Sequence, residues 1–132
     1  MAEQTIVIAN DDLTYLELIK DMLTNEGYQS VHCIVGTGTH DAIRRLEPAL
    51  VLLDINFEQP GPGWHLLDML RLHPATALIP IIICSTDPWL LQEKDGLLRT
   101  LHCDSLEKPF DLEMLLAKIR AAVGPPLKTV TA

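Results

Sequence analysis

The chain has 132 residues, of which 48% are hydrophobic, and this length suits one domain that buries its own core. Its 18 acidic and 10 basic residues give a formal net charge of −8, which disfavours direct binding to nucleic acid or to an anionic membrane. No apolar run approaches the roughly 20 residues of a membrane span. The start of the chain also lacks the basic and apolar segments of a signal peptide, so we expect a cytoplasmic location.

Short apolar runs alternate with amphipathic stretches, and this pattern predicts strands separated by helices. The runs are apolar throughout, which is typical of strands covered on both faces. In chain order we expect a strand over residues 5–9, a helix over 13–25, a strand over 29–34, a helix over 41–46 and a strand over 49–53. There follow a helix over 64–72 after the Pro- and Gly-rich residues 60–63, a strand over 79–83, a helix from 88, a strand over 105–108 and a helix over 112–123.

Residues with capping chemistry mark the ends of these helices. Asp12, Asp87 and Asp111 each precede a predicted helix, and each carries a side chain that accepts hydrogen bonds from free helical N–H groups. Pro88 suits the first helical position. Gly27 suits the left-handed conformation that commonly ends a helix, here the first one.

Strict alternation of strands and helices predicts an α/β fold with a parallel sheet, right-handed crossovers and helices on both faces. We expect residues 1–123 to form this single domain. Gly124 and the two prolines after it end the last helix. Residues 124–132 are therefore interpreted as a C-terminal tail or the stub of a linker.

The cysteines and histidines indicate neither a disulfide framework nor a zinc site. Cys33, Cys84 and Cys103 show no C-x-x-C spacing, and we interpret them as reduced, mostly buried thiols. The five histidines are scattered, with no pair at the spacing of metal ligands.

Polar side chains follow or end four of the five predicted strands, and these positions carry the chemistry. Ligands of open α/β sheets bind beyond the carboxyl ends of the strands. Asn10 and Asp11 follow the first strand, Asp54 follows the third, Ser85 comes after the fourth, and Lys108 ends the fifth. Clustered carboxylates raise one another's pKa unless a cation joins them, and hard oxygen ligands suit Mg²⁺. A lysine and a hydroxyl beside them fit phosphoryl transfer to a carboxylate nucleophile.

In this order, these motifs resemble the receiver domain of response regulators over about residues 5–123. The motifs are the acidic cluster at residues 10–12, the aspartate that closes residues 50–54, the hydroxyl after residues 80–84, and the triplet at residues 108–110. The resemblance implies a flavodoxin-like fold: a doubly wound (βα)5 sheet with strand order 2-1-3-4-5.

The resemblance also implies a role for each site residue. Asp54 would be the phosphorylation site, Asp11 a direct Mg²⁺ ligand, and the backbone carbonyl of Asn56 a further ligand. Ser85 and Lys108 would bind the phosphoryl group. The donor would be a histidine kinase or a phosphotransfer protein, and phosphorylation would switch binding to a downstream protein. Such a chain assists its own phosphorylation and dephosphorylation but is not an enzyme with a separate substrate. A homodimer is compatible with the resemblance.

Three residues depart from the family pattern. Asn10 stands at the first position of the usual acidic pair, where it would hold Mg²⁺ through water with one charge fewer. Thr86 replaces the small residue that usually follows the switch hydroxyl. Ser105 replaces an aromatic residue that often reorients on phosphorylation, so either the hydroxyl of Ser85 alone transmits the change or another residue takes that part. The loop after Asp54 is also longer than usual, by about one residue.

These departures keep a second reading open. The chain could be a pseudo-receiver, a phosphorylation-independent scaffold for protein binding. A phosphatase of the haloacid dehalogenase type is disfavoured, because its nucleophile belongs early in the fold and this chain leaves no room for a cap domain. Flavin binding is disfavoured as well, because the acidic residues after the first strand would repel a phosphate group.

Overall fold

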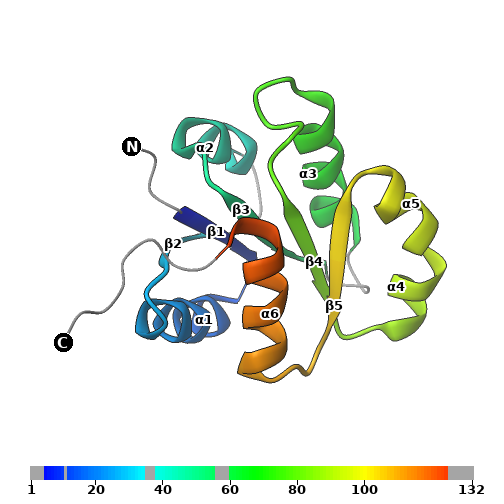
Figure 1. Ribbon diagram of the computed structural model, residues 1–132. Helices are drawn as coiled ribbons and strands as arrows, with labels where there is room; N and C mark the ends of the chain where they lie inside the picture. Colours follow the sequence, from blue (N-terminus) through cyan, green and yellow to red (C-terminus); the bar gives the residue numbers. More distant parts are fainter. Residues whose placement is uncertain (1–4, 11, 35–37, 56–59, 125–132) are drawn as a thin grey trace.

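The computed structural model describes residues 5–10, 12–34, 38–55 and 60–124. Five strands form a parallel sheet in the order β2-β1-β3-β4-β5 (Figure 1). The strands are β1 (Thr5–Asn10), β2 (Gln29–Ile34), β3 (Leu50–Asp54), β4 (Ile81–Ser85) and β5 (Cys103–Glu107). The predicted flavodoxin-like α/β fold and its strand order 2-1-3-4-5 are confirmed.

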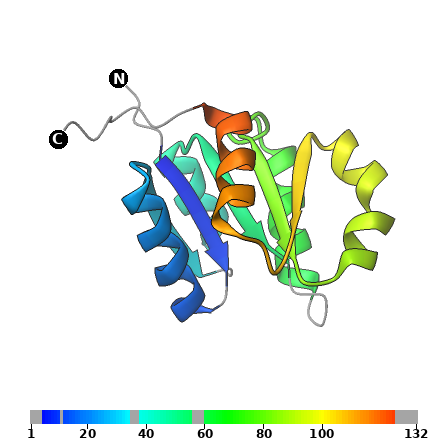
Figure 2. The same cartoon turned by 60° about the horizontal axis from the view of Figure 1, so that its bottom comes forward.

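Helices cover both faces of the sheet (Figures 1 and 2). One face carries α1 (Leu13–Asn25) and α6 (Leu112–Val123). The other face carries α2 (Thr39–Leu46), α3 (Pro60–Leu72), α4 (Pro88–Glu93) and α5 (Asp95–Thr100). Within the described ranges, no helix combines the length and the apolar character that crossing a bilayer would require.

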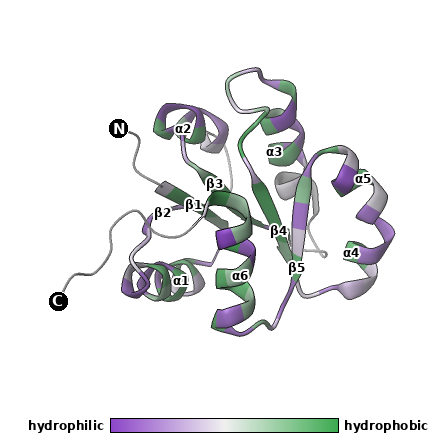
Figure 3. Ribbon diagram, in the orientation of Figure 1, coloured by the Kyte–Doolittle hydropathy of each residue, from purple (hydrophilic) through white to green (hydrophobic). Residues whose placement is uncertain are grey.

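The apolar strands divide their side chains between two core clusters, one on each face of the sheet. Ile8, Leu52 and Ile82 are buried under α1 and α6. Their neighbours in sequence point the other way, as Val51 and Ile83 do against the cluster of α2 to α5. Successive side chains of a strand alternate between faces, so strands buried on both faces must be apolar at every position. Figure 3 shows this as hydrophobic colouring along the central strands.

The predicted caps hold the helices in place. The Asp12 carboxylate accepts hydrogen bonds from the backbone N–H groups of Thr14 and Tyr15 at 3.0 and 3.3 Å. Asp87 and Asp111 accept in the same way at the starts of α4 and α6, at 3.1 and 2.8 Å. Because these helices begin directly beyond strand ends, the caps also fix the loops that surround the carboxyl edge of the sheet.

The start of α3 was predicted wrongly. It begins at Pro60, four residues before the expected position, so the Pro- and Gly-rich stretch is its first turn. Proline is tolerated there because the first N–H groups of a helix have no intrahelical partner. Gly63 lets this turn approach the end of β3, since a Cβ atom at Gly63 would lie 3.1 Å from Cγ1 of Ile55. The helix is thereby held against the strand that carries Asp54.

Further elements differ from the prediction. Strand β4 lies over residues 81–85 and not 79–83, and α2 begins at Thr39, two residues before the expected position. The fourth helix is two short helices, α4 and α5, joined at Lys94, which ends one and precedes the other. Strand β5 lies over residues 103–107 and not 105–108, so Lys108 begins the following loop. Of its side chains only Leu106 is fully buried, which explains why the sequence signal for this strand was weak.

Arg71, near the end of α3, ties together the connections at the amino ends of β4 and β5. Its guanidinium donates to the carbonyl oxygen of Leu101 at 2.7 Å and to that of Ala77 at 3.0 Å. Longer contacts reach the carbonyls of Thr76 and His102 at 3.4 and 3.5 Å. The network lies at the edge of the sheet opposite to the one where Asp54 and Ser85 end their strands.

Candidate functional site

The carboxyl ends of β1, β3 and β4 bring the predicted site residues to one edge of the sheet (Figure 2). Asp54 ends β3 beside Cys84 of β4, and the pairing of Ala9 with Leu53 places Asn10 at the neighbouring end of β1. The Asp54 side chain is 16% exposed. It is thus a largely covered carboxylate that is still open to a reactant.

Lys108 meets Asp54 at this edge. Its Nζ lies 2.5 Å from Oδ1 of Asp54, and its side chain is 15% exposed. The backbone N–H of Lys108 donates to the carbonyl oxygen of Ser85 at 2.8 Å, which fixes the loop after β5 to the end of β4. The Lys108–Pro109 peptide bond is cis. The structure therefore brings together the two residues on which the sequence interpretation depended most.

Ser85 is buried at the end of β4, with 1% of its surface exposed. Its Oγ accepts the backbone N–H of Asp87 at 3.1 Å, while the Asp87 carboxylate caps α4. The hydroxyl is therefore part of the turn that leads from β4 into α4. Thr86, the residue between them, is exposed.

Asn10 is 3% exposed at the end of β1, and its Oδ1 accepts the backbone N–H of Asp12 at 3.1 Å. Asp11 and Asn56, the predicted direct metal ligands beside Asp54, lie outside the described residues, as does the extra residue expected within 57–59. Within the described ranges no group of three His, Cys, Asp or Glu side chains is placed to hold a metal ion. The donors that are described, a carboxylate and an amide oxygen on adjacent strands, are of the hard type that Mg²⁺ prefers.

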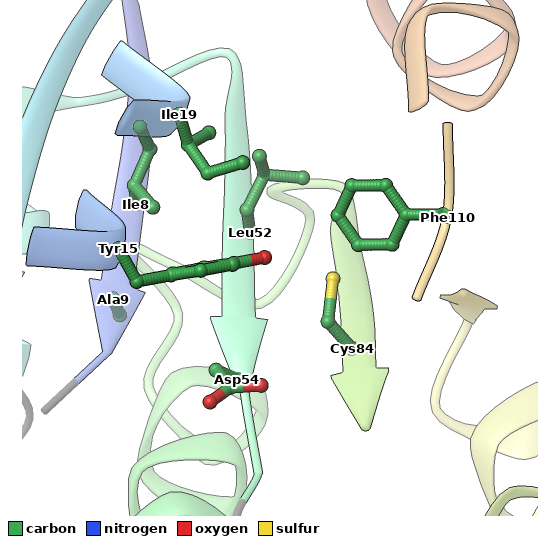
Figure 4. A pocket seen from close by; sticks show the side chains of 8 residues that line it. All are labelled: Ile8, Ala9, Tyr15, Ile19, Leu52, Asp54, Cys84 and Phe110. Atoms are coloured by element: carbon green, nitrogen blue, oxygen red, sulfur yellow. The ribbon is translucent and has the colours of Figure 1, made fainter. Parts of the chain in front are cut away.

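Sequence reasoning missed Tyr15, which lies in the first turn of α1. Nζ of Lys108 lies 4.0 Å from the centroid of its ring. Tyr15, Asp54, Cys84 and Phe110 line a small pocket whose remaining walls come from the core (Figure 4). Tyr15, Lys108 and Phe110 also line a shallow outer groove of about 430 Å³. The place of Tyr15 in the sequence could have indicated it as a site residue. Tyr15 stands three residues after the capping Asp12 and therefore in a helical turn that borders the strand ends.

Burial raises the pKa of two weakly acidic groups in this pocket, the thiol of Cys84 and the phenol of Tyr15. It raises the pKa of the Cys84 thiol to about 12, with Lys108 lowering that value and Asp54 raising it. Burial also raises the pKa of the Tyr15 phenol, and the nearby Cys84 and Asp54 raise it further. At neutral pH the thiol and the phenol are therefore uncharged, and the ion pair of Asp54 with Lys108 supplies the charge next to the pocket.

Residues 6–120 match the response regulator receiver domain family, and the chain therefore belongs to this family. The resemblance inferred from the motifs is confirmed. Among curated relatives, the DNA-binding response regulator MtrA of Mycolicibacterium paratuberculosis is 31% identical over 120 residues, which cover 89% of this chain and 50% of that protein. The chain spans about half the length of the curated relatives it matches first.

Solved structures agree on the fold. The chemotaxis protein CheY4 of Vibrio cholerae superposes with a TM-score of 0.77 at 19% identity, covering 92% of this chain and 99% of that one. The receiver domain of the sensor histidine kinase PA1611 from Pseudomonas aeruginosa gives a TM-score of 0.76 at 21% identity, covering 93% and 99%. That second structure is described with a magnesium ion coordinated in its active site cleft.

Proposed function

We propose that this receiver domain is a phosphoacceptor in which Asp54 takes a phosphoryl group from a histidine kinase or a phosphotransfer protein. One observation carries the proposal: the Lys108 ammonium contacts the Asp54 carboxylate at the carboxyl edge of the sheet. A fixed cation at this place stabilises the negative charge of a phosphoryl group that moves onto the carboxylate. The magnesium ion described in the PA1611 receiver domain supports the same reading.

In the proposed reaction, one Asp54 carboxylate oxygen forms a bond to phosphorus as the bond between phosphorus and the donor's imidazole nitrogen breaks. The electron pair of the broken bond stays on the imidazole, whose other ring nitrogen carries a proton, so the donor leaves as a neutral histidine and Asp54 becomes an acyl phosphate. Lys108 and the Ser85 hydroxyl bind phosphoryl oxygens. Such transfers depend mainly on positioning and on charge neutralisation, and the network from Ser85 to Lys108 serves both.

The residues of this edge would also hold Mg²⁺. Asp11, Asp54 and the backbone carbonyl of Asn56 are the proposed direct ligands, and Asn10 would bind the ion through water. When bound, the ion offsets the negative charge that the carboxylates and the phosphoryl oxygens bring together.

The proposed output is a change in protein binding. Receiver domains are signalling modules, so the acyl phosphate here would shift contacts with a downstream protein. MtrA is named as a DNA-binding response regulator, but the part of it that matches this chain is about half of its length. With a net charge of −8, this chain is a poor candidate for direct contact with DNA.

Incubation with acetyl phosphate and Mg²⁺, followed by intact-mass measurement, tests the proposal. We expect the wild-type chain to gain the mass of one phosphoryl group and the Asp54→Ala variant to gain none. The alternative is a pseudo-receiver that binds partners without phosphorylation, and it is favoured by the missing charge at Asn10. A wild-type chain that stays unmodified over hours would support that alternative.

Asn10→Asp should strengthen Mg²⁺ binding about tenfold, because it restores a charge beside Asp54 and cation affinity follows the charge of the ligands. Titration of Mg²⁺ against intrinsic tryptophan fluorescence measures the affinity, with the exposed Trp89 near the β4 end as a reporter. Asn25→Asp is the matched control, since it adds the same charge at the far end of α1. Equal affinities in the two variants would contradict a role for position 10.

A further inference from the structure

Tyr15 is fixed in place beside the proposed phosphoacceptor. It is the third residue of α1, and its backbone N–H is held by the Asp12 cap. Its ring packs against the core cluster beneath α1 and α6. Figure 4 shows the ring extending across the pocket above the Asp54 carboxylate, with its hydroxyl directed toward Cys84 and Phe110. The cap fixes the backbone of Tyr15, and the core packs against its ring. The aromatic face of Tyr15 is therefore presented in a constant position.

The Lys108 ammonium contacts both this ring and the Asp54 carboxylate. The ring centroid lies 4.0 Å from Nζ, and Oδ1 of Asp54 lies 2.5 Å from it. A lysine side chain is flexible along its four-carbon stem, whereas an aromatic face attracts a cation at a defined place. The ring therefore restricts where the ammonium lies independently of the charge on Asp54.

We propose that Tyr15 is a positioning residue for phosphoryl transfer at Asp54. The Tyr15 ring holds the Lys108 ammonium beside the acceptor carboxylate. This inference rests on the proposed function. Once the phosphoryl group is bonded to Asp54, the carboxylate loses its full negative charge and its ion pair with Lys108 weakens. The contact with the ring remains, and it keeps the ammonium beside the phosphoryl oxygens.

The ring, and not the hydroxyl, carries this role. The phenol is uncharged at neutral pH, since its ordinary pKa already lies well above neutrality and burial raises the pKa of Tyr15 further. Tyr15→Phe keeps the aromatic face and is therefore the conservative variant, while Tyr15→Leu removes the face and retains an apolar side chain. Tyr28, the other tyrosine, is buried in the same core cluster. Its hydroxyl donates to the carbonyl of Gly124, so Tyr28→Leu is a matched control for lost packing.

Proton NMR of the Lys108 ε-methylene group tests the contact without any phosphorylation. An aromatic face shifts protons above it upfield. We expect an upfield-shifted signal in the wild type, in Tyr15→Phe and in Tyr28→Leu, and a return to the ordinary lysine position in Tyr15→Leu. An unchanged signal in Tyr15→Leu would overturn the inference.

The rate of phosphoryl incorporation from acetyl phosphate tests the consequence. We expect Tyr15→Leu to be about fivefold slower than wild type, the size of effect that loss of a partly desolvated cation–π contact produces. Tyr15→Phe should recover the wild-type rate. Equal rates in Tyr15→Leu and wild type, or the same slowing in Tyr28→Leu, would overturn the positioning role. If the wild type itself takes up no phosphoryl group, the proposed function fails, while the NMR comparison still decides whether Tyr15 holds Lys108.

Discussion

Replacing Lys108 by methionine should slow phosphoryl incorporation at Asp54 about 100-fold, the loss that follows removal of one preorganised charge donor from a reaction site. Methionine keeps much of the length of the side chain and removes its charge. The ammonium is the one described cation in contact with the Asp54 carboxylate, so no neighbouring described side chain replaces it. Intact-mass measurement at timed intervals with acetyl phosphate and Mg²⁺ gives the rate.

Lys118→Met is the matched control for this experiment. Lys118 also pairs with an aspartate, Asp104, at 2.8 Å, but this pair lies on the surface with side chains 36% and 49% exposed. Removing it should leave the rate within about twofold of wild type, because exposed ion pairs contribute little. Equal rates in Lys108→Met and Lys118→Met would show that the cation next to Asp54 has no special part in the transfer.

Arg71→Leu should lower the free energy of unfolding by about 3 kcal/mol, since hydrogen bonds from a charged donor contribute more than neutral ones and their loss leaves carbonyl groups without a partner. The guanidinium of Arg71 holds the carbonyls of Leu101 and Ala77, which belong to two separate connections of the fold. Urea denaturation followed by circular dichroism measures the change.

Arg99→Leu is the control for Arg71. Arg99 pairs with Asp95 across one turn of α5, and its side chain is 79% exposed. We expect this variant to stay within about 0.5 kcal/mol of wild type. Arg71→Lys should recover only part of the stability, because an ammonium lacks the planar fork that reaches several carbonyls. Similar losses at positions 71 and 99 would contradict the structural role of the Arg71 network.

The fold could be predicted from the sequence because its determinants are local. Strands covered on both faces are apolar at every position, and aspartates such as Asp12 and Asp111 cap helices with their own neighbours. The break between α4 and α5 at Lys94 was missed, although the dipeptide Asp95-Gly96 directly after it is of a kind that commonly marks a turn. The start of α3 was placed too late, because Gly and Pro usually mark loops and here form a first turn packed against Ile55.

Of the candidate site, only the residues at the ends of strands could be predicted from the sequence. Asp54, Ser85 and Lys108 follow strand signals, and parallel strands bring such positions to one edge. Tyr15 could not be found in this way, because its contact with Lys108 joins residues 93 positions apart and depends on how α1 packs beside the loop after β5. Periodicity assigns a helical aromatic residue to the core, and it does not show which cation its face meets.

Reductive trapping of the phosphorylated chain tests the central claim most directly. Borohydride converts an aspartyl phosphate to homoserine, and peptide mass mapping then locates the altered residue. We predict homoserine at position 54 in the wild-type chain after treatment with acetyl phosphate and Mg²⁺, and at no other aspartate. Homoserine at a different position, or an unaltered Asp54 in a chain that binds Mg²⁺, would contradict the assignment of Asp54 as the phosphoacceptor.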